Sequence, residues 1–185
     1  MLFHSFGGGT GSGFFSLLLE HLSSEYSKNK KIEFSIFPDE KYSNSVFEPY
    51  NTVLSFSESV NLSDRCFLFD NESLYDICHK KLQIKKPTYS NLNNVLCQAI
   101  SSITYPLRFI DLCVPQQVDF FDRFMAHYER FHYFVCSYAG FLSSECSCAP
   151  FDVSVLTDLI FDDKNMMFRC NPYDGKFLRC SALYR

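Results

Sequence analysis

The chain has 185 residues, of which 46% are hydrophobic and 21% are charged, with a net charge of −4. This length suits one domain or two small pieces, and the apolar content is enough for a hydrophobic core. The acidic balance argues against binding to a nucleic-acid backbone, and no apolar run reaches the roughly 18 residues of a membrane span. Neither nucleic acid nor a membrane is therefore an expected partner, and no signal peptide is predicted at the N-terminus.

The first feature along the chain is a glycine-rich stretch between a predicted strand, Met1–Phe6, and a predicted helix over 14–27. Five of the seven glycines lie in Gly7–Gly13, called here the glycine segment. Glycine lets the backbone approach an anion closely or take a positive φ, and the N–H groups then point at the ligand from the positive end of the helix. No Lys-Ser or Lys-Thr pair closes the segment, so it differs from the common P-loop. A flexible linker is the alternative, which the bulky apolar helix that follows makes the weaker interpretation.

Two more strands are predicted further along the chain. Alternation over 31–37 predicts a strand that Pro38 ends, followed by a polar loop over 39–45. Glu48 and Pro49 open a short helix, and 66–69 has the pattern of a short buried strand. Asn71 directly follows that strand, at the place where ligands bind in open α/β sheets.

The later elements are mostly helical. Helices are predicted at 74–82 and, as the longest, from Pro87-Thr88 to about residue 104, where Pro106 stops it. The alternation of strands and helices over 1–105 predicts a parallel, Rossmann-like sheet. Beyond it we expect a helix at 110–127, a strand at 131–138, a loop at 139–150, a helix at 151–161, a turn at 171–175 and a strand at 176–184.

Three polar residues could recognise a base. Tyr89 and Asn93 are four residues apart on one predicted helix and so share a face, while Asn71 supplies a second amide at a strand end. A ring and two amides suit stacking on a purine and hydrogen bonding to it. The alternative is that these side chains cap helices or stabilise turns.

No Cys or His metal site is predicted. The nine cysteines are irregularly spaced, with Cys146 and Cys148 as the only close pair, and the five histidines are scattered. Reduced, mostly buried thiols are the expectation.

The glycine segment, Gly-Gly-Gly-Thr-Gly-Ser-Gly, resembles the signature of the tubulin/FtsZ family, and Phe6 and Phe14 beside it resemble the α-tubulin type. Matches continue in order through nearly the whole chain, at Lys31–Pro38, Glu48–Asn51, Asp70–Glu72, Tyr75–Cys78, Pro87–Asn93, Ser101–Thr104 and Ala182–Arg185. The resemblance implies the later half of the family's GTPase sheet in 1–109, with a core helix at about 88–105, and the incomplete start of a second, intermediate α+β domain in 110–185. The chain thus resembles an internal fragment or a truncated, divergent copy.

The resemblance also implies a GTP site. Its residues would be Ser5, Gly8, Gly9, Thr10, Gly11 and Ser12 near the phosphates, Asn44 and Glu48 near the ribose, and Asn71, Tyr89 and Asn93 at the guanine. Asn44 departs from the family's usual Thr. Mg²⁺ is expected in the full-length family member, with its contacts outside this chain, and no metal ligand is assigned here.

In the family, an acidic residue of the α-type chain acts on the GTP of the adjacent subunit as a general base for water. The matching position is Asp119, where the family has Glu, and Asp122 is a lesser candidate. Asp is one methylene shorter, and a displacement of about 1 Å in a catalytic group can cost about 100-fold. A solvated carboxylate on a helix face is an equal alternative.

Three functions follow from these patterns. The first is an α-tubulin-like, GTP-binding subunit of cytoplasmic microtubules, which pairs with β-tubulin and contacts neighbouring tubulins in the lattice. The second is a truncated remnant that neither polymerises nor binds GTP by itself, with an unpaired sheet edge and poor solubility. The third, a free-standing nucleotide-binding enzyme, is the weakest because no nucleophile or triad spacing appears.

Overall fold

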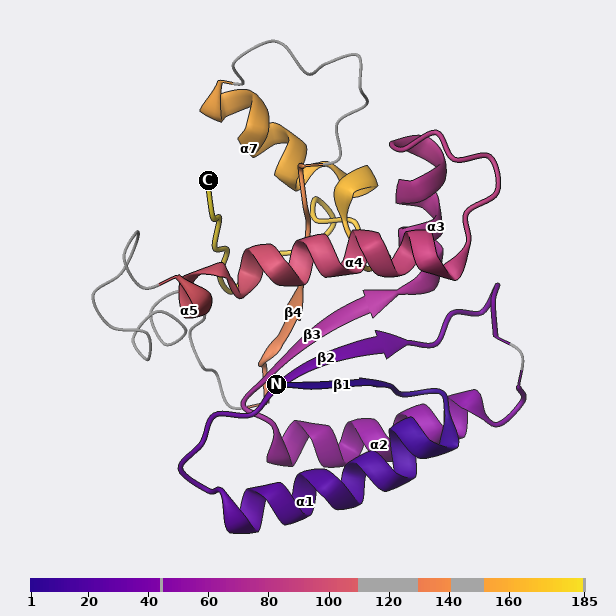
Figure 1. The fold of residues 1–185 in the computed structure, drawn as a ribbon, viewed down its shortest axis with the longest axis vertical. Coiled ribbons are helices and arrows are strands. Elements are labelled where there is room, and N and C mark those ends of the chain that lie inside the picture. Colours follow the sequence, from indigo (N-terminus) through magenta and orange to yellow (C-terminus); the bar gives the residue numbers. More distant parts are fainter. Residues whose placement is uncertain (44, 110–129, 141–151, 185) are drawn as a thin grey trace.

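The computed structural model describes residues 1–43, 45–109, 130–140 and 152–184, and their strands form one parallel sheet (Figure 1). The strand order is β1-β2-β3-β4, which is also the order along the chain. The strands are β1 (Leu2–Ser5), β2 (Ile32–Phe37), β3 (Arg65–Asp70) and β4 (Tyr133–Val135). The predicted parallel α/β fold is therefore confirmed.

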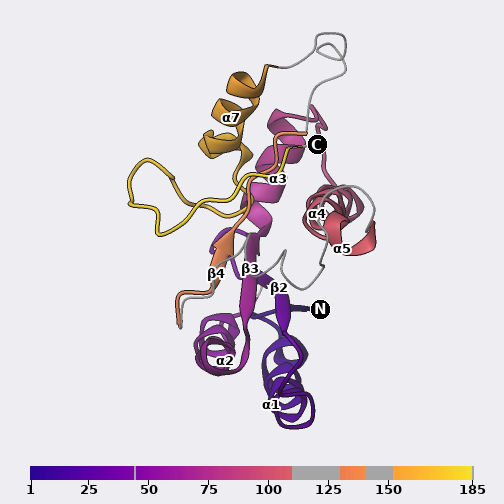
Figure 2. The same ribbon diagram turned by 90° about the vertical axis from the view of Figure 1, so that its left-hand side faces the viewer.

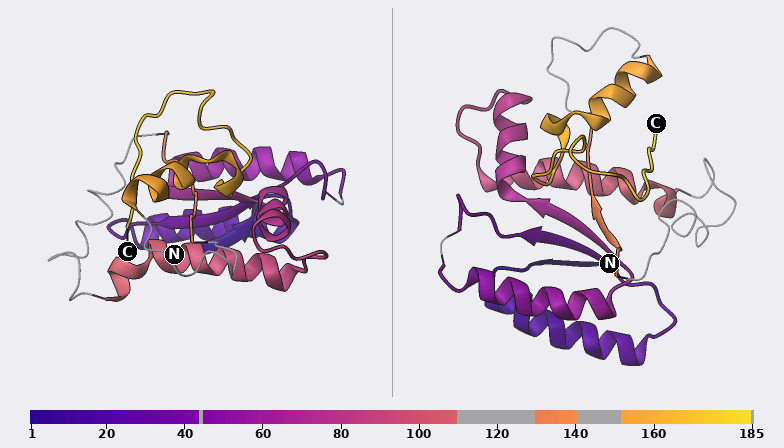
Figure 3. Two further views of the ribbon diagram at one scale, coloured as in Figure 1. Left: turned by 90° about the horizontal axis from the view of Figure 1, so that it is seen from above. Right: turned by 180° about the vertical axis from the view of Figure 1, so that it is seen from behind.

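Helices cover both faces of the sheet. Two of them, α1 (Phe15–Glu25) and α2 (Glu48–Leu62), lie side by side under one face (Figure 2), and α4 (Tyr89–Ile103) crosses the other. Viewed from above in Figure 3, the sheet lies between α2 and α4. The remaining helices are η1 (Thr10–Phe14), α3 (Asn71–Lys80), α5 (Tyr105–Arg108), α7 (Val153–Phe161) and η3 (Asp163–Asn165). None of the helices in the described residues is long and apolar enough to cross a membrane.

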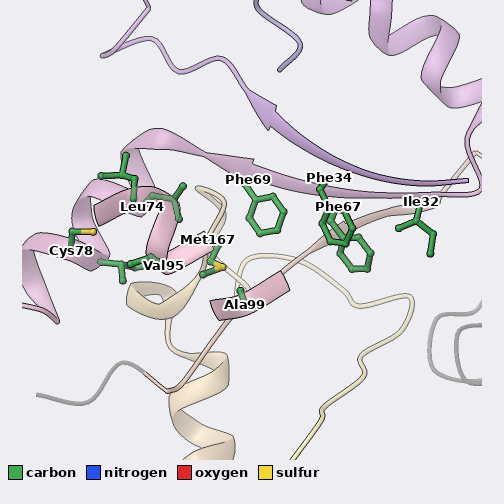
Figure 4. Close-up of a cluster of buried hydrophobic side chains, with 11 residues drawn as sticks. Ile32, Phe34, Phe67, Phe69, Leu74, Cys78, Val95, Ala99 and Met167 are labelled. Atoms are coloured by element: carbon green, nitrogen blue, oxygen red, sulfur yellow. The ribbon is translucent and has the colours of Figure 1, made fainter. Parts of the chain in front are cut away.

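A row of phenylalanine rings runs across the sheet on the α4 side. Phe3, Phe34, Phe67 and Phe134 occupy register positions on successive strands, with ring centroids 5.0, 5.0 and 5.5 Å apart. Aromatic pairs on neighbouring strands stabilise a sheet beyond the area that they bury. Leu92, Val95 and Ala99 of α4 belong to the same main core as Phe34 and Phe67, and Figure 4 shows part of this core.

The opposite face of β2 is polar and nevertheless buried. Glu33 and Ser35 alternate with the apolar residues of this strand, and both have no exposed surface. Alternation predicted the strand correctly, but it does not divide core from solvent here, because a parallel sheet is covered on both faces.

Most predicted elements are confirmed with shifted ends. The helix at Glu48 is not short: it runs 15 residues to Leu62 as α2. Helix α3 begins at Asn71 rather than at Leu74 because the Asp70 side chain caps it. The predicted strand at 131–138 pairs with β3 only over Tyr133–Val135.

The predicted strand at 176–184 is wrong. Its residues are exposed and join no sheet within the described parts of the chain. A strand needs a neighbouring strand, and among the described residues none pairs with this segment, whose Phe177 ring contacts Phe161 and whose Tyr184 hydroxyl bonds Thr157 Oγ1. The helix predicted at 110–127 and most of the loop predicted at 139–150 lie outside the described residues.

Candidate functional site

The candidate site lies where the parallel strands end. Strand β1 ends at Ser5, and β3 ends at Asp70, directly before Asn71. Ser5 pairs with Ile36, which in turn pairs with Phe69, so Ser5 and Asn71 leave the same edge of the sheet two strands apart. At the usual strand spacing this is about 10 Å. In Figure 1 the arrowheads of β2 and β3 lie on the same side of the molecule as the first turn of α4.

Glu48 lies beside the glycine segment, although about 40 residues separate them in sequence. A Cβ on Gly7 would meet Glu48 Cγ at 3.2 Å. The Asn51 side chain, one turn further along α2, donates from Nδ2 to the Gly7 carbonyl at 2.9 Å. The first turn of α2 is therefore fastened to the start of the glycine segment.

The glycine segment needs glycine because its backbone lies close to β1, and not because any of its residues has a positive φ. None of the described glycines has a positive φ, and Thr10–Phe14 form a turn of π-helix that continues into α1. A Cβ on Gly11 would lie 2.2 Å from the Ser5 carbonyl oxygen, so the helix start presses directly against β1. A Cβ on Gly8, Gly9 or Gly13 would meet nothing within 4 Å. A ligand could approach the backbone at those three open positions.

The two hydroxyls of the glycine segment are placed differently. Ser12 is buried, and its Oγ donates to the Gly8 carbonyl at 2.7 Å, while its N–H donates to the same carbonyl at 2.9 Å. Thr10 is exposed at the start of the helical turn. Of the two, Thr10 is the hydroxyl that faces solvent.

Helix α3 is capped by Asp70 and not by Asn71. Asp70 accepts hydrogen bonds from Ser73 N–H at 2.6 Å, from Ser73 Oγ at 3.0 Å, and from the backbone N–H of Arg169. Burial raises the pKa of the Asp70 carboxyl, and the bonds from Ser73 and Arg169 oppose that rise. The half-buried Asn71 is thus the first helical residue, and the predicted alternative that it serves as the cap does not hold.

The cap of α4 likewise leaves Asn93 out. Thr88 and Asn91 form a capping box, in which Asn91 Oδ1 accepts from Thr88 N–H at 3.0 Å and from Thr88 Oγ1 at 2.7 Å. Tyr89 is 65% exposed and Asn93, one turn later, is also exposed. Both side chains therefore remain accessible from solvent.

Tyr89 belongs to a group of three tyrosines. The Tyr75 and Tyr42 rings stack with centroids 4.6 Å apart. The pKa of Tyr75 is raised, mainly by burial and to a smaller extent by the neighbouring Tyr89 and Tyr42 hydroxyls. Lys41, in the same loop as Tyr42, lies 5.6 Å from the centre of the Tyr42 ring and 3.7 Å from Glu72. The loop after β2 thus brings aromatic surface and a cation towards the first turn of α4.

A hollow on the described surface lies elsewhere. It measures about 390 Å³ and lies between α3 and the segment around η3, with Glu72, Lys164 and Arg169 among its lining residues. Arg169 Nη1 bonds Glu72 Oε2 at 2.7 Å across it. None of the predicted site residues lines this hollow, so it gives no support to them.

Three predicted residues cannot be placed: Asn44, Asp119 and Asp122 lie outside the described residues. Within the described ranges, no group of three His, Cys, Asp or Glu side chains could hold a metal ion.

Sequence reasoning missed two residues beside the glycine segment. His4, in the middle of β1, bonds through Nδ1 to the Gly11 carbonyl at 2.8 Å, and its Nε2 lies 3.7 Å from Glu33 Oε2. The signal that could have found His4 is a histidine within a short apolar strand immediately before the glycine segment, whereas Glu33 carries no such signal.

Comparison with known proteins finds two family models that match this chain. The model of the tubulin/FtsZ family GTPase domain matches residues 1–79, and that of the tubulin C-terminal domain matches residues 129–185. The chain is similar to the tubulin alpha-8 chain of Caenorhabditis elegans, with 43% identity over 186 residues. This match covers 100% of the chain and 41% of the relative, so the chain spans about two fifths of that protein's length.

Proposed function

Because the chain belongs to the tubulin family, with its GTPase and C-terminal segments both present, we propose that it acts as an α-tubulin-like, GTP-binding subunit. The nucleotide would bind at the carboxyl edge of the sheet, between the glycine segment and the first turn of α4. The observation that carries the proposal is the shared edge: Ser5, the glycine segment, Glu48 and Asn71 all lie there.

The proposed contacts follow from exposure and chemistry. The open backbone at Gly8 and Gly9, with the first N–H groups of the helix and the Thr10 hydroxyl, would bind phosphate oxygens. Gly11 would take part through its backbone N–H, and Ser12 would hold the turn in place, because its hydroxyl and its N–H both donate to the Gly8 carbonyl. Ser5, at the end of β1, lies next to Gly11 and completes this set.

The base and the ribose would be bound by residues at the starts of α2, α3 and α4. The exposed ring of Tyr89 would stack on guanine, while the Asn71 and Asn93 amides would bond its polar edge. Glu48 would accept a bond from a ribose hydroxyl, with Asn44 nearby. Mg²⁺, when bound, would neutralise phosphate charge, and the described residues offer no cluster of ligands for it.

The proposal extends to assembly. The subunit would pair with β-tubulin and join the cytoplasmic microtubule lattice, with residues 1–109 as the nucleotide-binding part and 110–185 as the start of the second domain. Asp119 would activate water against the GTP of the adjacent subunit. The alternative is a remnant that neither polymerises nor binds GTP by itself; the exposed apolar side chains Phe3, Phe14 and Leu17 near the edge strand β1 favour that interpretation of the isolated chain.

Direct GTP binding to the purified chain separates these alternatives. We expect saturable binding that Tyr89→Ala weakens by about fivefold or more, because base–aromatic stacking contributes about 1–3 kcal/mol. Tyr26→Ala is the matched control, since Tyr26 is similarly exposed at the end of α1. No saturable binding to a folded chain would favour the remnant.

The catalytic part of the proposal needs copolymers with β-tubulin. There Asp119→Ala should abolish GTP hydrolysis, and unchanged hydrolysis would refute the assignment of Asp119.

A further inference from the structure

A row of polar side chains, called here the polar row, runs through the interior from β4 to the glycine segment. Tyr133 OH donates to Ser59 Oγ at 3.1 Å, and Ser59 Oγ donates to Glu33 Oε2 at 2.7 Å. Glu33 Oε2 lies 3.7 Å from His4 Nε2, and His4 Nδ1 bonds the Gly11 carbonyl at 2.8 Å. The polar row therefore connects the segment that the C-terminal family model matches to the segment that the GTPase model matches.

Two residues of the polar row are buried, and each has one side-chain atom without a hydrogen-bond partner among the described residues. The His4 and Glu33 side chains are 3% and 0% exposed, and His4 Nε2 and Glu33 Oε1 lack such a partner. Burial of an ionisable side chain with an unsatisfied polar atom costs stability, so the His4–Glu33 pair calls for a role other than stabilising the core.

The direction of the hydrogen bond between His4 and Gly11 follows from the acceptor. A carbonyl oxygen can only accept, so Nδ1 carries a proton and donates to Gly11. The ring is then fixed by stacking on Phe15, with centroids 3.5 Å apart and planes 9° apart, and by an edge contact with Phe6. A ring held by two aromatic neighbours and at Nδ1 has little freedom to rotate.

We propose that His4 is a positioning residue for the glycine segment, and that the buried contact of its ring with Glu33 links this arrangement through Ser59 and Tyr133 to β4. The Gly11 carbonyl lies in the helical turn that starts at Thr10, so the bond from His4 sets how that turn sits against β1. The inference concerns the placement of the glycine segment, and its relevance to GTP rests on the proposed function.

Hydrogen exchange in the full chain tests the placement without any nucleotide. His4→Phe keeps a ring against Phe15 and removes both nitrogens. We expect it to speed exchange of the glycine-segment amides about tenfold, as loss of one hydrogen bond would. Exchange in α4 should stay unchanged, which separates a local effect from general destabilisation.

His4→Asn provides the rescue, because its amide nitrogen stands close to the place of Nδ1 and can donate to Gly11. Most of the slow exchange should return. His21→Phe, the same substitution at an exposed position of α1, is the matched control and should change nothing. Equal acceleration in all segments, or none in the glycine segment, would overturn the proposal.

Tyr133→Phe is a second variant for the case that His4→Phe does not fold, because it removes only one oxygen, at the β4 end of the polar row. It should speed exchange of the glycine segment about threefold, and an unchanged rate would overturn the link to β4.

GTP titration of the same variants then separates the two proposals. If the exchange pattern holds but the unsubstituted chain binds no GTP, the proposed function fails and the positioning role stands. If GTP binds equally to the unsubstituted chain and His4→Phe while exchange differs, His4 has no role in the site.

Discussion

Replacement of Gly11 by alanine should destabilise the fold, although alanine favours helices. Gly11 lies in the helical turn Thr10–Phe14, and its φ is not positive, so backbone strain does not enter. The obstacle is contact: the added Cβ would lie 2.2 Å from the Ser5 carbonyl oxygen and 3.1 Å from the Ser5 nitrogen. Both atoms belong to the backbone of β1, so they cannot swing aside as a side chain would.

The magnitude follows from two opposing effects. Overpacking costs typically about 1–3 kcal/mol, and contact with paired strand backbone places this site at the upper end. Helix propensity returns about 1 kcal/mol for glycine to alanine. The net expectation for Gly11→Ala is therefore a loss of about 2 kcal/mol. Gly13→Ala, two residues on, meets nothing within 4 Å and should gain up to about 1 kcal/mol.

Urea unfolding, followed by circular dichroism because the chain has no tryptophan, measures the difference. With a slope of about 2 kcal/mol per molar urea, the midpoints of Gly11→Ala and Gly13→Ala should differ by about 1.5 M. Equal midpoints for the two variants would refute the reasoning that close approach to β1 is what requires glycine at position 11.

Two further outcomes follow from the buried ionisable groups. Since burial raises the pKa of Asp70, the folded state retains its proton to higher pH than the unfolded state, so this carboxyl lowers stability as pH rises from about 4 through its raised pKa. Asp70→Asn should remove that decline from the curve of urea midpoint against pH, and parallel curves for both proteins would contradict this. Burial also raises the pKa of Cys66 and brings the pKa of Cys136 to about 12, so iodoacetamide should label exposed Cys97 well before either, as peptide mass spectrometry would show.

The fold was predictable because its signals are local. Alternation over 31–37, the apolar run before Asn71 and the stripe of α4 each report the strand or helix in which they lie. Their order then indicated a parallel sheet, since strands separated by helices pair in that way.

What could not be predicted depends on distant partners. Glu33 has the pattern of the outer face of a strand, and only the position of α2 shows that Ser59 covers it. The segment 176–184 has the composition of a strand, but composition does not supply a neighbour. Likewise, Asn71 and Asp70 look equally suited to cap α3, and the choice depends on the backbone of β3.

The caps bear on how the edge of the sheet is interpreted. Asp70, Thr88 and Ser12 use their side-chain hydrogen bonds on the backbone or the cap beside them. The amides predicted to bind a base, Asn71 and Asn93, are thereby released from the structural role that was the main alternative for them. Polar side chains held at one edge of a sheet, and not needed for its helices, are what a ligand site requires. The caps therefore leave both amides available at this edge, and their binding to a base stays a prediction that the GTP titration tests.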